Sequence, residues 1–124
     1  MSYFTDDNNP STWYKKGKSF YTQGKLQEAQ NCVDKALKID PSFSKAQELV
    51  RLIHKRNLVR ELVEAGRQDH FEMSKEFIKQ VDEDFFSALK TEAAYLRLKG
   101  NARAADWLEN EAVRNLNLMK MMFG

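Results

Sequence analysis

The stretch GKSFYTQGKLQEA, residues 17–29, decides the fold of this chain. Gly17 lies inside a helical pattern, where glycine costs about 0.5 to 1 kcal/mol relative to alanine. At about 100° per residue, Trp13, Gly17 and Phe20 share one narrow helix face, and a small residue on that face lets a second helix approach closely. Gly24 then ends the helix as its C′ residue. The pattern predicts a tightly packed pair of helices.

The partner helix is expected from Leu26 to Ile39, and it ends at Asp40 because the residue before Pro41 avoids helical geometry. Its inward face carries Ala29, Val33 and Ala36. The first helix is expected from about Thr12 to Gln23, after a turn at Asn9-Pro10 and an N-cap at Ser11. Together the two segments predict an antiparallel hairpin.

These residues resemble a tetratricopeptide repeat, a unit of 34 residues with aromatic, small and proline positions at fixed spacing. The matching positions lie in residues 10–43 and are Trp13, Gly17, Phe20, Gly24, Ala29, Ala36 and Pro41. Lys16 and Val33 depart from the pattern, which has leucine and a larger aromatic residue there. The resemblance implies a protein-interaction scaffold, because members of the family serve as scaffolds for diverse partners.

A weaker echo of the same spacing lies 76 residues downstream, at Leu89, Ala93, Leu96, Gly100, Ala105 and Ala112. Glu109 and Asn117 stand where the first hairpin has Val33 and Pro41. Two interpretations stay open: a degenerate repeat-like hairpin at about 82–120, or the agreement that any antiparallel helix pair with a glycine stop produces. Both predict paired helices.

The remaining segments also follow helical spacing. Residues 44–66 predict one long helix that packs on the hairpin and caps it, with Asn57 as a point of interruption. Residues 67–81 predict a short helix, and residues 82–122 a second hairpin that begins at an Asp82 N-cap and turns at Gly100. No segment alternates at period two, so no sheet is expected. We predict an all-α, right-handed array of antiparallel helix pairs with about six helices, in a single domain over 10–124 behind a flexible segment 1–9.

Length and composition limit the classes of function. The chain has 124 residues and a formal charge of +2, which is too small to attract nucleic acid or anionic membranes in bulk. Its single cysteine excludes an internal disulfide and a cysteine-based zinc site. There is no secretory signal pattern and no run of about 20 apolar residues. We expect a complete cytoplasmic protein.

Catalytic ingredients are sparse. The densest cluster is Asp69-His70 with Glu72, in a polar turn where such residues usually cap a helix. Cys32 follows the hairpin's core pattern, and neither His54 nor His70 lies near it in sequence. No phosphate-binding loop or metal-ligand spacing occurs. We expect no enzyme activity, no metal and no cofactor.

One face of the first helix is not used by the predicted core. Tyr14, Lys18 and Tyr21 lie roughly 75 to 135° from the core direction, bordered by Ser11 and Thr22. Tyrosine contact area and lysine charge together suit another protein or peptide of acidic character. The alternative is that both tyrosines pack on a neighbouring helix.

The resemblance implies that this face lines a concave groove, to which the third helix adds Lys45, Leu52 and Lys55. Some members of the family bind a C-terminal carboxylate through lysine and asparagine at the positions that Tyr14 and Lys18 occupy here. These substitutions disfavour that ligand. The leading hypothesis is a small adaptor that uses the groove.

Two further hypotheses come from other classes. A homo-oligomer would use the exposed repeat face and the apolar end of the chain, which contains Leu116, Leu118, Met119, Met121, Met122 and Phe123. The alternative, which implies no partner, is that this end folds back onto the chain's own helices. Nucleic-acid binding would use the basic stretch of Lys45, Arg51, Lys55, Arg56 and Arg60, which contains one acid, Glu48.

Overall fold

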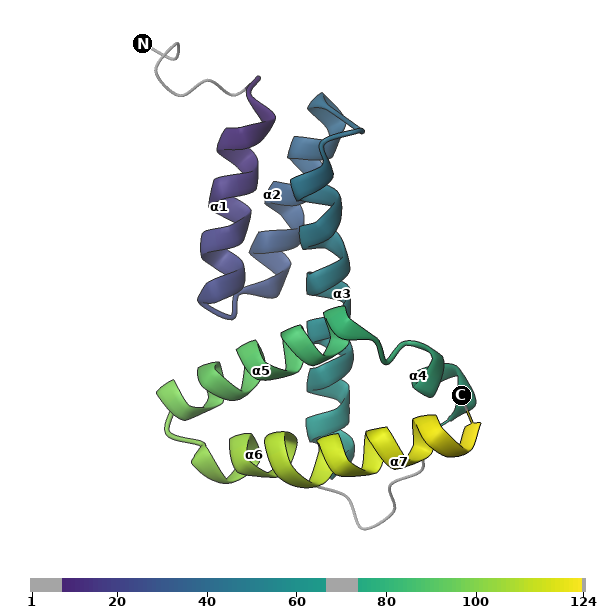
Figure 1. The fold of residues 1–124 in the computed structure, drawn as a ribbon. Coiled ribbons are helices and arrows are strands. Elements are labelled where there is room, and N and C mark those ends of the chain that lie inside the picture. The colour runs from purple at the N-terminus through teal and green to yellow at the C-terminus, as the bar shows by residue number, and fades with distance from the viewer. Residues whose placement is uncertain (1–7, 67–73, 124) are drawn as a thin grey trace. The chain divides into compact units, whose positions relative to one another are not determined.

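The described part of the chain is helical throughout. The computed structural model describes residues 8–66 and 74–123, and this part contains no strand. The elements in chain order are α1 (Pro10–Thr22), α2 (Leu26–Ile39), α3 (Ser44–Gly66), α4 (Lys75–Lys79), α5 (Glu83–Leu98), α6 (Ala102–Trp107), the π-helical turn η2 (Leu108–Ala112) and α7 (Val113–Phe123) (Figure 1). The all-α class built from helical hairpins is confirmed.

The chain divides into two compact units, residues 1–53 and 54–124. The first unit contains α1, α2 and residues 44–53 of α3, and the second contains residues 54–66 of α3 with α4 to α7. Each unit has its own apolar core. A single domain over 10–124 therefore stays a prediction, and each unit is considered by itself below.

The start of α1 differs from the prediction by two residues. The helix begins at Pro10, and Asn9 is its N-cap, since the Ser11 amide donates to Asn9 Oδ1 at 2.9 Å. The predicted start at Thr12 with an N-cap at Ser11 was wrong. Proline at the first helical position lacks only an amide that has no partner in the helix, so Asn-Pro marks the true boundary.

The end of α1 is a Schellman motif. Gly24 has φ of 81°, its amide donates to the Tyr21 carbonyl at 3.0 Å, and the Lys25 amide donates to the Phe20 carbonyl at 2.9 Å. Glycine takes this left-handed conformation without the steric cost that a Cβ would add. The predicted role of Gly24 is confirmed.

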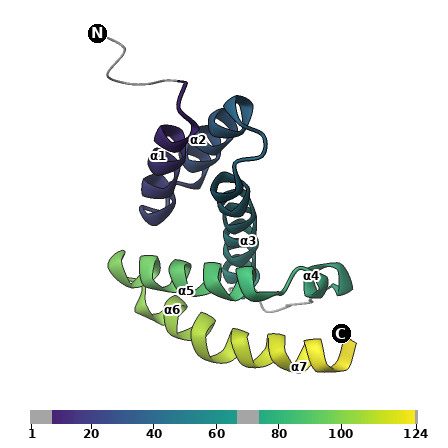
Figure 2. The same cartoon turned by 45° about the horizontal axis from the view of Figure 1, so that its top comes forward.

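Gly17 lies where α1 and α2 cross. A Cβ built on it would be 3.1 Å from Val33 Cγ2, 3.3 Å from the Ala29 carbonyl oxygen and 3.3 Å from Cys32 Cβ. Ala29, Val33 and Ala36 have no exposed area. The missing side chain thus lets the two backbones approach, and the helices lie antiparallel and side by side (Figure 2).

The first turns of α3 complete the core of the first unit. Ala46, Leu49 and Ile53 are at most 4% exposed and belong to one buried cluster with residues of α1 and α2. A lone repeat leaves one apolar face open, and here α3 covers such a face. The helix begins and ends at the predicted residues and is not interrupted at Asn57.

The second unit is a second hairpin packed on the end of α3. Asp82 is the N-cap of α5, as predicted, because the Phe85 amide donates to Asp82 Oδ1 at 2.9 Å. Helix α5 ends at another Schellman glycine, Gly100, with φ of 84°. The return run α6–η2–α7 follows the predicted range but contains a π-helical turn that was not predicted. The core joins Val59, Leu62, Val81, Phe85, Ala88, Leu89, Leu108, Ala112 and Leu116.

Candidate functional site

Four of the predicted groove residues form one stripe along α1. Tyr14, Lys18 and Thr22 follow one another at intervals of four, and Ser11 lies one turn before Tyr14, so all share a helix face. Lys18 and Thr22 are exposed, whereas Ser11 and Tyr14 are half-buried. The Thr22 hydroxyl donates to the Lys18 carbonyl oxygen at 3.1 Å. We call these four residues the α1 stripe.

The α1 stripe meets the start of α3 through an aromatic contact. The rings of Tyr14 and Phe43 pack edge to face, with centroids 5.8 Å apart. Lys45, two residues after Phe43, is exposed on the first turn of α3. Leu52 is half-buried against the core of the first unit. Tyr14 therefore joins the α1 stripe to the turn that leads into α3, two residues before the exposed Lys45.

Two predicted groove residues are buried. Tyr21 is 7% exposed and belongs to the core of the first unit. It follows Gly17 by four residues, so it lies only about 40° from the direction in which α1 faces α2. That spacing was visible in the sequence and favours packing over exposure for Tyr21.

Lys55 is buried inside the second unit. It is 8% exposed, and its ammonium donates to the Gln80 carbonyl oxygen at 2.6 Å and pairs with Asp82 Oδ2 at 3.2 Å. A second contact reaches Gln80 Oε1 at 3.3 Å. These contacts tie α3 to the turn that leads into α5. Gln80 and Asp82 lie 25 and 27 residues further along the chain, so local spacing gives no signal of this role.

The positive charge of the first unit is concentrated on α1. Residues 1–53 carry eight lysines and arginines and six acidic residues. Helix α1 contributes Lys15, Lys16 and Lys18 and has no acidic residue at all. Clustered positive charge on one helix raises the concentration of anionic partners near its surface.

Trp13 explains how the chain tolerates Lys16. The ammonium groups of Lys16 and Lys35 lie 4.8 and 4.3 Å from the Trp13 ring centroid. Cation–π attraction therefore replaces the leucine contact typical of the repeat, and both lysines stay exposed. The other departure, Val33, is fully buried, so the smaller side chain leaves no exposed gap.

The residues considered for catalysis form no site within the described residues. Burial raises the pKa of the Cys32 thiol above its usual range, although Lys16 and Lys35 lower it in part. A protonated thiol is a poor nucleophile. His54 is exposed, and no group of three or more potential metal ligands occurs within residues 8–66 and 74–123. Asp69, His70 and Glu72 lie outside the described residues.

The basic stretch on α3 supplies structural ion pairs. Arg56 is fully buried and its Nε lies 2.7 Å from Glu92 Oε1, while Arg60 Nε lies 3.1 Å from Glu92 Oε2. The guanidinium carbons of both arginines are 5.4 Å from the Tyr95 ring centroid. Local spacing gives no signal of this cluster, because Glu92 lies on another helix, 36 residues after Arg56.

Comparison with known proteins agrees with the resemblance seen in the sequence. No curated protein and no solved structure matches the chain. In the described part, no helix has the length and apolar character needed to cross a membrane. The family model of the tetratricopeptide repeat matches residues 10–43, the segment predicted to be such a repeat and folded here as α1, α2 and the turn that follows.

Proposed function

We propose that this chain is a small non-enzymatic adaptor that binds an acidic segment of another protein. The contact surface is the α1 stripe together with Lys45. Tetratricopeptide repeats mediate protein–protein interactions, and residues 10–43 match that family model. The observation that carries the proposal is the three-lysine, acid-free helix α1 beside an accessible tyrosine edge.

The chemistry of this surface favours acidic peptides. Lys18 and Lys45 are exposed, so their charge steers an acidic segment during encounter without a large desolvation cost. Tyr14 is already held by Phe43, so its ring offers contact area with little loss of side-chain entropy. Tyr21 and Lys55 are left out of this surface because both are buried. Leu52 forms its apolar border.

A peptide titration tests the proposal. We expect a labelled peptide of glutamates around one aromatic residue to bind, with NMR shift changes grouped on the α1 stripe and the first turn of α3. Affinity should fall as salt is raised, because screening weakens attraction between exposed charges. Lys18→Glu with Lys45→Glu should weaken binding by about tenfold or more, while the fold is kept.

Lys38→Glu is the matched control. Lys38 is an exposed lysine of the same unit, on α2 instead of α1. The substitution Lys38→Glu changes the total charge of the protein but not the proposed surface. If Lys38→Glu weakens peptide binding as much as Lys18→Glu alone or Lys45→Glu alone, the effect is one of total charge, and the α1 stripe is not the binding site.

Nucleic-acid binding has less support. Lys55, Arg56 and Arg60, three cations of the basic stretch, pair with acids inside the second unit. Phosphate binding would need cations that face solvent and release counterions. Absence of retention on a nucleic-acid column at low salt would exclude it.

A cytoplasmic location belongs to the same proposal. It is supported by the one cysteine, which is a buried free thiol. Reducing compartments keep such thiols unpaired.

A further inference from the structure

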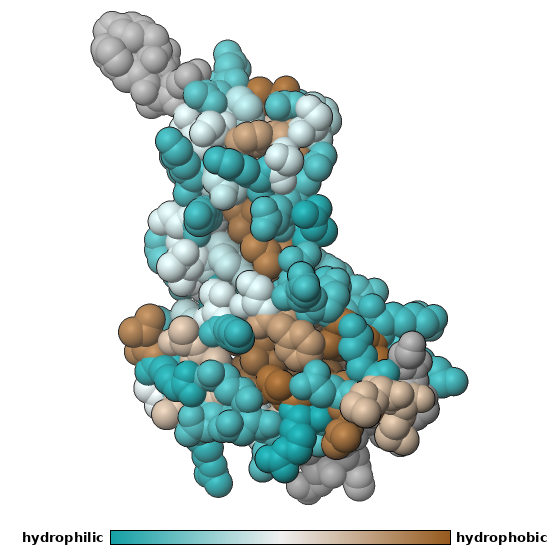
Figure 3. Space-filling view, in the orientation of Figure 1, coloured by the Kyte–Doolittle hydropathy of each residue, from teal (hydrophilic) through white to brown (hydrophobic). Residues whose placement is uncertain are grey.

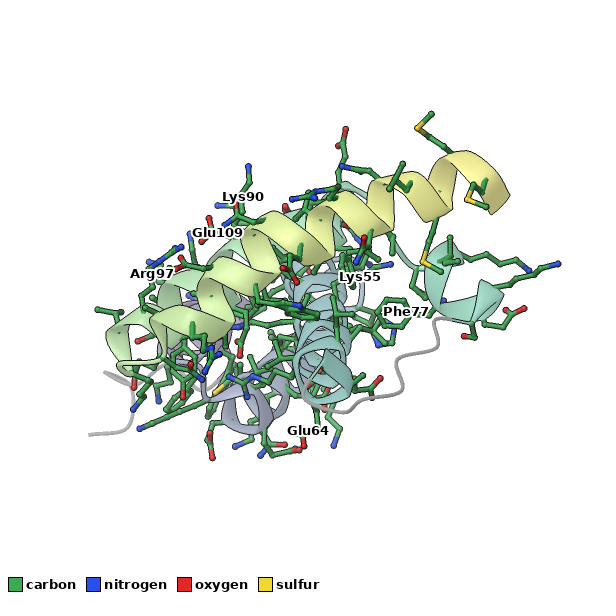
Figure 4. The ribbon with its side chains drawn as sticks, turned by 90° about the horizontal axis from the view of Figure 1, so that it is seen from below. Lys55, Glu64, Phe77, Lys90, Arg97 and Glu109 are labelled. Carbon is green, nitrogen blue, oxygen red and sulfur yellow. The ribbon has the colours of Figure 1, made fainter. Side chains whose placement is uncertain are left out.

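Two hollows on the surface of the second unit differ in charge. The groove between α5 and α7 has a volume of about 320 Å³, and apolar side chains gather between these helices (Figure 3). Lys90 and Glu109 line this groove with opposite charges and lie close together (Figure 4). The described residues that line the other hollow, between the end of α3 and the start of α6, include a cation and no acid. A ligand with a single charge is therefore better matched to the second hollow.

The second hollow has a volume of about 460 Å³, and we call it the α3–α6 pocket. Pockets of about 300 to 1,000 Å³ are typical of small-molecule sites. Apolar side chains line this one together with an amide and a guanidinium, and the residues are Val63, Gly66, Asn101, Arg103, Ala104 and Trp107. All of them belong to the second unit, so the pocket is formed within one compact unit.

An indole ring forms one wall of the pocket because Gly66 has no side chain. A Cβ built on Gly66 would lie 2.6 Å from Cη2 and 2.7 Å from Cζ2 of Trp107, so the ring packs against the backbone at the end of α3. Trp107 is only half-buried, and Val63, one turn before Gly66, is half-buried as well. The accessible parts of both side chains offer an apolar surface on which an aromatic ring can pack.

The polar groups of the pocket favour an anion. Arg103 is exposed and forms no ion pair with the residues that the structure describes. The acid nearest to it in sequence, Asp106, pairs with Arg97 at 3.0 Å. Asn101 uses its Oδ1 atom to cap α6, since the Ala104 amide donates to it at 3.2 Å. The amide nitrogen of Asn101 therefore remains as a donor on the pocket wall.

We propose that the α3–α6 pocket binds a small aromatic molecule with one anionic group, such as an aromatic carboxylate. The ring packs on Trp107 and Val63, while the carboxylate pairs with Arg103 and accepts a hydrogen bond from Asn101. Arginine suits this role because its guanidinium presents parallel donors to both carboxylate oxygens. The pocket shares no residue with the α1 stripe, so small-molecule binding and peptide binding can fail separately.

A pair of probes that differ in charge tests the proposal. Naphthaleneacetate has an aromatic ring and a carboxylate, and naphthaleneacetamide replaces the carboxylate by a neutral amide of similar shape. In an NMR titration of the full chain, naphthaleneacetate should bind with a dissociation constant of about a millimolar or less, and should shift the signals of the Trp107 indole and the Asn101 side chain. Naphthaleneacetamide should bind about tenfold more weakly, because it forms no ion pair with Arg103.

Two substitutions separate the effect of charge from that of the cavity. Arg103→Gln should weaken naphthaleneacetate binding by about tenfold and leave naphthaleneacetamide binding unchanged. Ala104→Leu places a larger side chain in the pocket and should weaken the binding of both probes. Leucine is a good helix former, so circular dichroism should show that helix content is kept. Arg114→Gln is the matched control, since Arg114 is an exposed arginine of α7 that does not line the pocket.

The proposal is overturned if naphthaleneacetate causes no shift changes at millimolar concentration, or if the wild type binds both probes equally. Equal weakening by Arg103→Gln and Arg114→Gln would also overturn it, because the effect would then be one of total charge. Shift changes centred on Phe86 and Val113 would place the probe in the α5–α7 groove instead. If a peptide with an aromatic residue beside a glutamate binds the pocket and naphthaleneacetate does not, the occupant is a protein segment and the proposal is wrong.

Discussion

The two hairpins of this chain have the same local geometry but different sequences. Both turn at a Schellman glycine: the Gly100 amide donates to the Arg97 carbonyl at 3.0 Å and the Asn101 amide to the Leu96 carbonyl at 2.8 Å, as at Gly24. Ala105 and Ala112 are as fully buried as Ala29 and Ala36, within 2%. Small residues at these intervals, with a glycine stop, therefore produce a hairpin even where the larger signature residues differ.

The hairpins differ in where they place charge and regular helix. The first keeps its lysines in solvent and its second helix is uninterrupted. The second hairpin contributes buried Glu92, which pairs with Arg56, and its return helix contains the π-helical turn η2. A surface cation is available to a partner, whereas a buried one is committed to the fold. The lysines of the first hairpin are therefore accessible to solvent, whereas Arg56 of the second unit is used in an internal ion pair.

The largest effect should come from breaking the buried pair. Glu92→Gln leaves Arg56 buried without its carboxylate, which should lower the free energy of unfolding by about 3 to 5 kcal/mol. Urea denaturation followed by circular dichroism measures the loss. Such a loss would strengthen the contrast between the two hairpins, because no substitution of an exposed lysine of α1 should lower the free energy of unfolding by a comparable amount.

A double variant tests whether the loss of stability comes from leaving one charge buried without its partner or from losing the ion pair as a whole. Arg56→Met with Glu92→Leu removes both charges and keeps apolar volume, so much of the lost stability should return. If the double variant is less stable than Glu92→Gln, the pair itself is not the source of the effect.

The next largest effect on stability should come from a substitution at the crossing of α1 and α2. Gly17→Leu forces a side chain between α1 and α2 and should cost about 1 to 3 kcal/mol, because Val33, Cys32 and the Ala29 carbonyl already lie within 3.3 Å of the added Cβ. Thermal unfolding of the variant measures this cost. The counterpart in the second hairpin is a buried alanine, Ala93, so Ala93→Gly should cost less, about 1 kcal/mol. A cost for Ala93→Gly as large as that of Gly17→Leu would mean that packing around Ala93, and not helix propensity alone, sets its effect.

Substitution of the Schellman glycine, a feature of both hairpins, should lower stability by a smaller amount. At Gly100 no atom lies within 4 Å of a built Cβ, so Gly100→Ala should cost only the left-handed backbone strain, about 1 to 2 kcal/mol. Gly100→Asn should recover part of it, since asparagine tolerates this conformation better. Thermal unfolding of both variants provides the measurement, and an alanine variant as stable as the wild type would contradict the strain argument.

Local sequence rules predicted the elements but not the contacts between distant helices. The glycine stops, the Asp82 N-cap and the bounds of α2 and α3 each depend on neighbours within a few residues, and each was predicted. Gly66 was read only as a helix end. In the structure its missing side chain also admits the Trp107 ring, since a Cβ there would be 2.6 Å from Cη2. No local pattern signals such a contact.

The residues of the candidate site also fall into two groups, those that local spacing predicts and those that depend on distant helices. The α1 stripe follows from helical spacing, so its exposed lysine, Lys18, was identified from the sequence. The burial of Lys55 and Arg56 depends on Asp82 and Glu92, which lie 27 and 36 residues further along the chain. A cationic stretch looks alike whether its charges face solvent or acids on another helix, and only the tertiary structure separates the two cases.

The smallest effect should come from the pH dependence of Asp82. Burial works against its charge, but hydrogen bonds from the Phe85 amide and the Lys55 ammonium hold the pKa of this carboxyl below its usual range. The unfolded chain therefore binds a proton more readily than the folded one, so this stabilisation is present at neutral pH and is lost as pH falls through the folded pKa. Asp82→Asn should keep the helix cap, because asparagine caps as well as aspartate, but should lose the ion pair.

The Asp82 side chain is 50% exposed, so the expected loss at neutral pH is less than about 1 kcal/mol. The sharper measurement is the slope of stability against pH. The difference between the wild type and Asp82→Asn should begin to shrink near the usual pKa of aspartate, about 4, and should vanish only below the lower pKa of the folded state, where Asp82 is protonated in both states. Lys55→Met should remove the same contribution to the slope of stability against pH. Because Lys55 is buried, circular dichroism should first show that this variant is folded. Parallel curves for wild type and Asp82→Asn across the acid range would mean that the Lys55–Asp82 pair contributes nothing to stability.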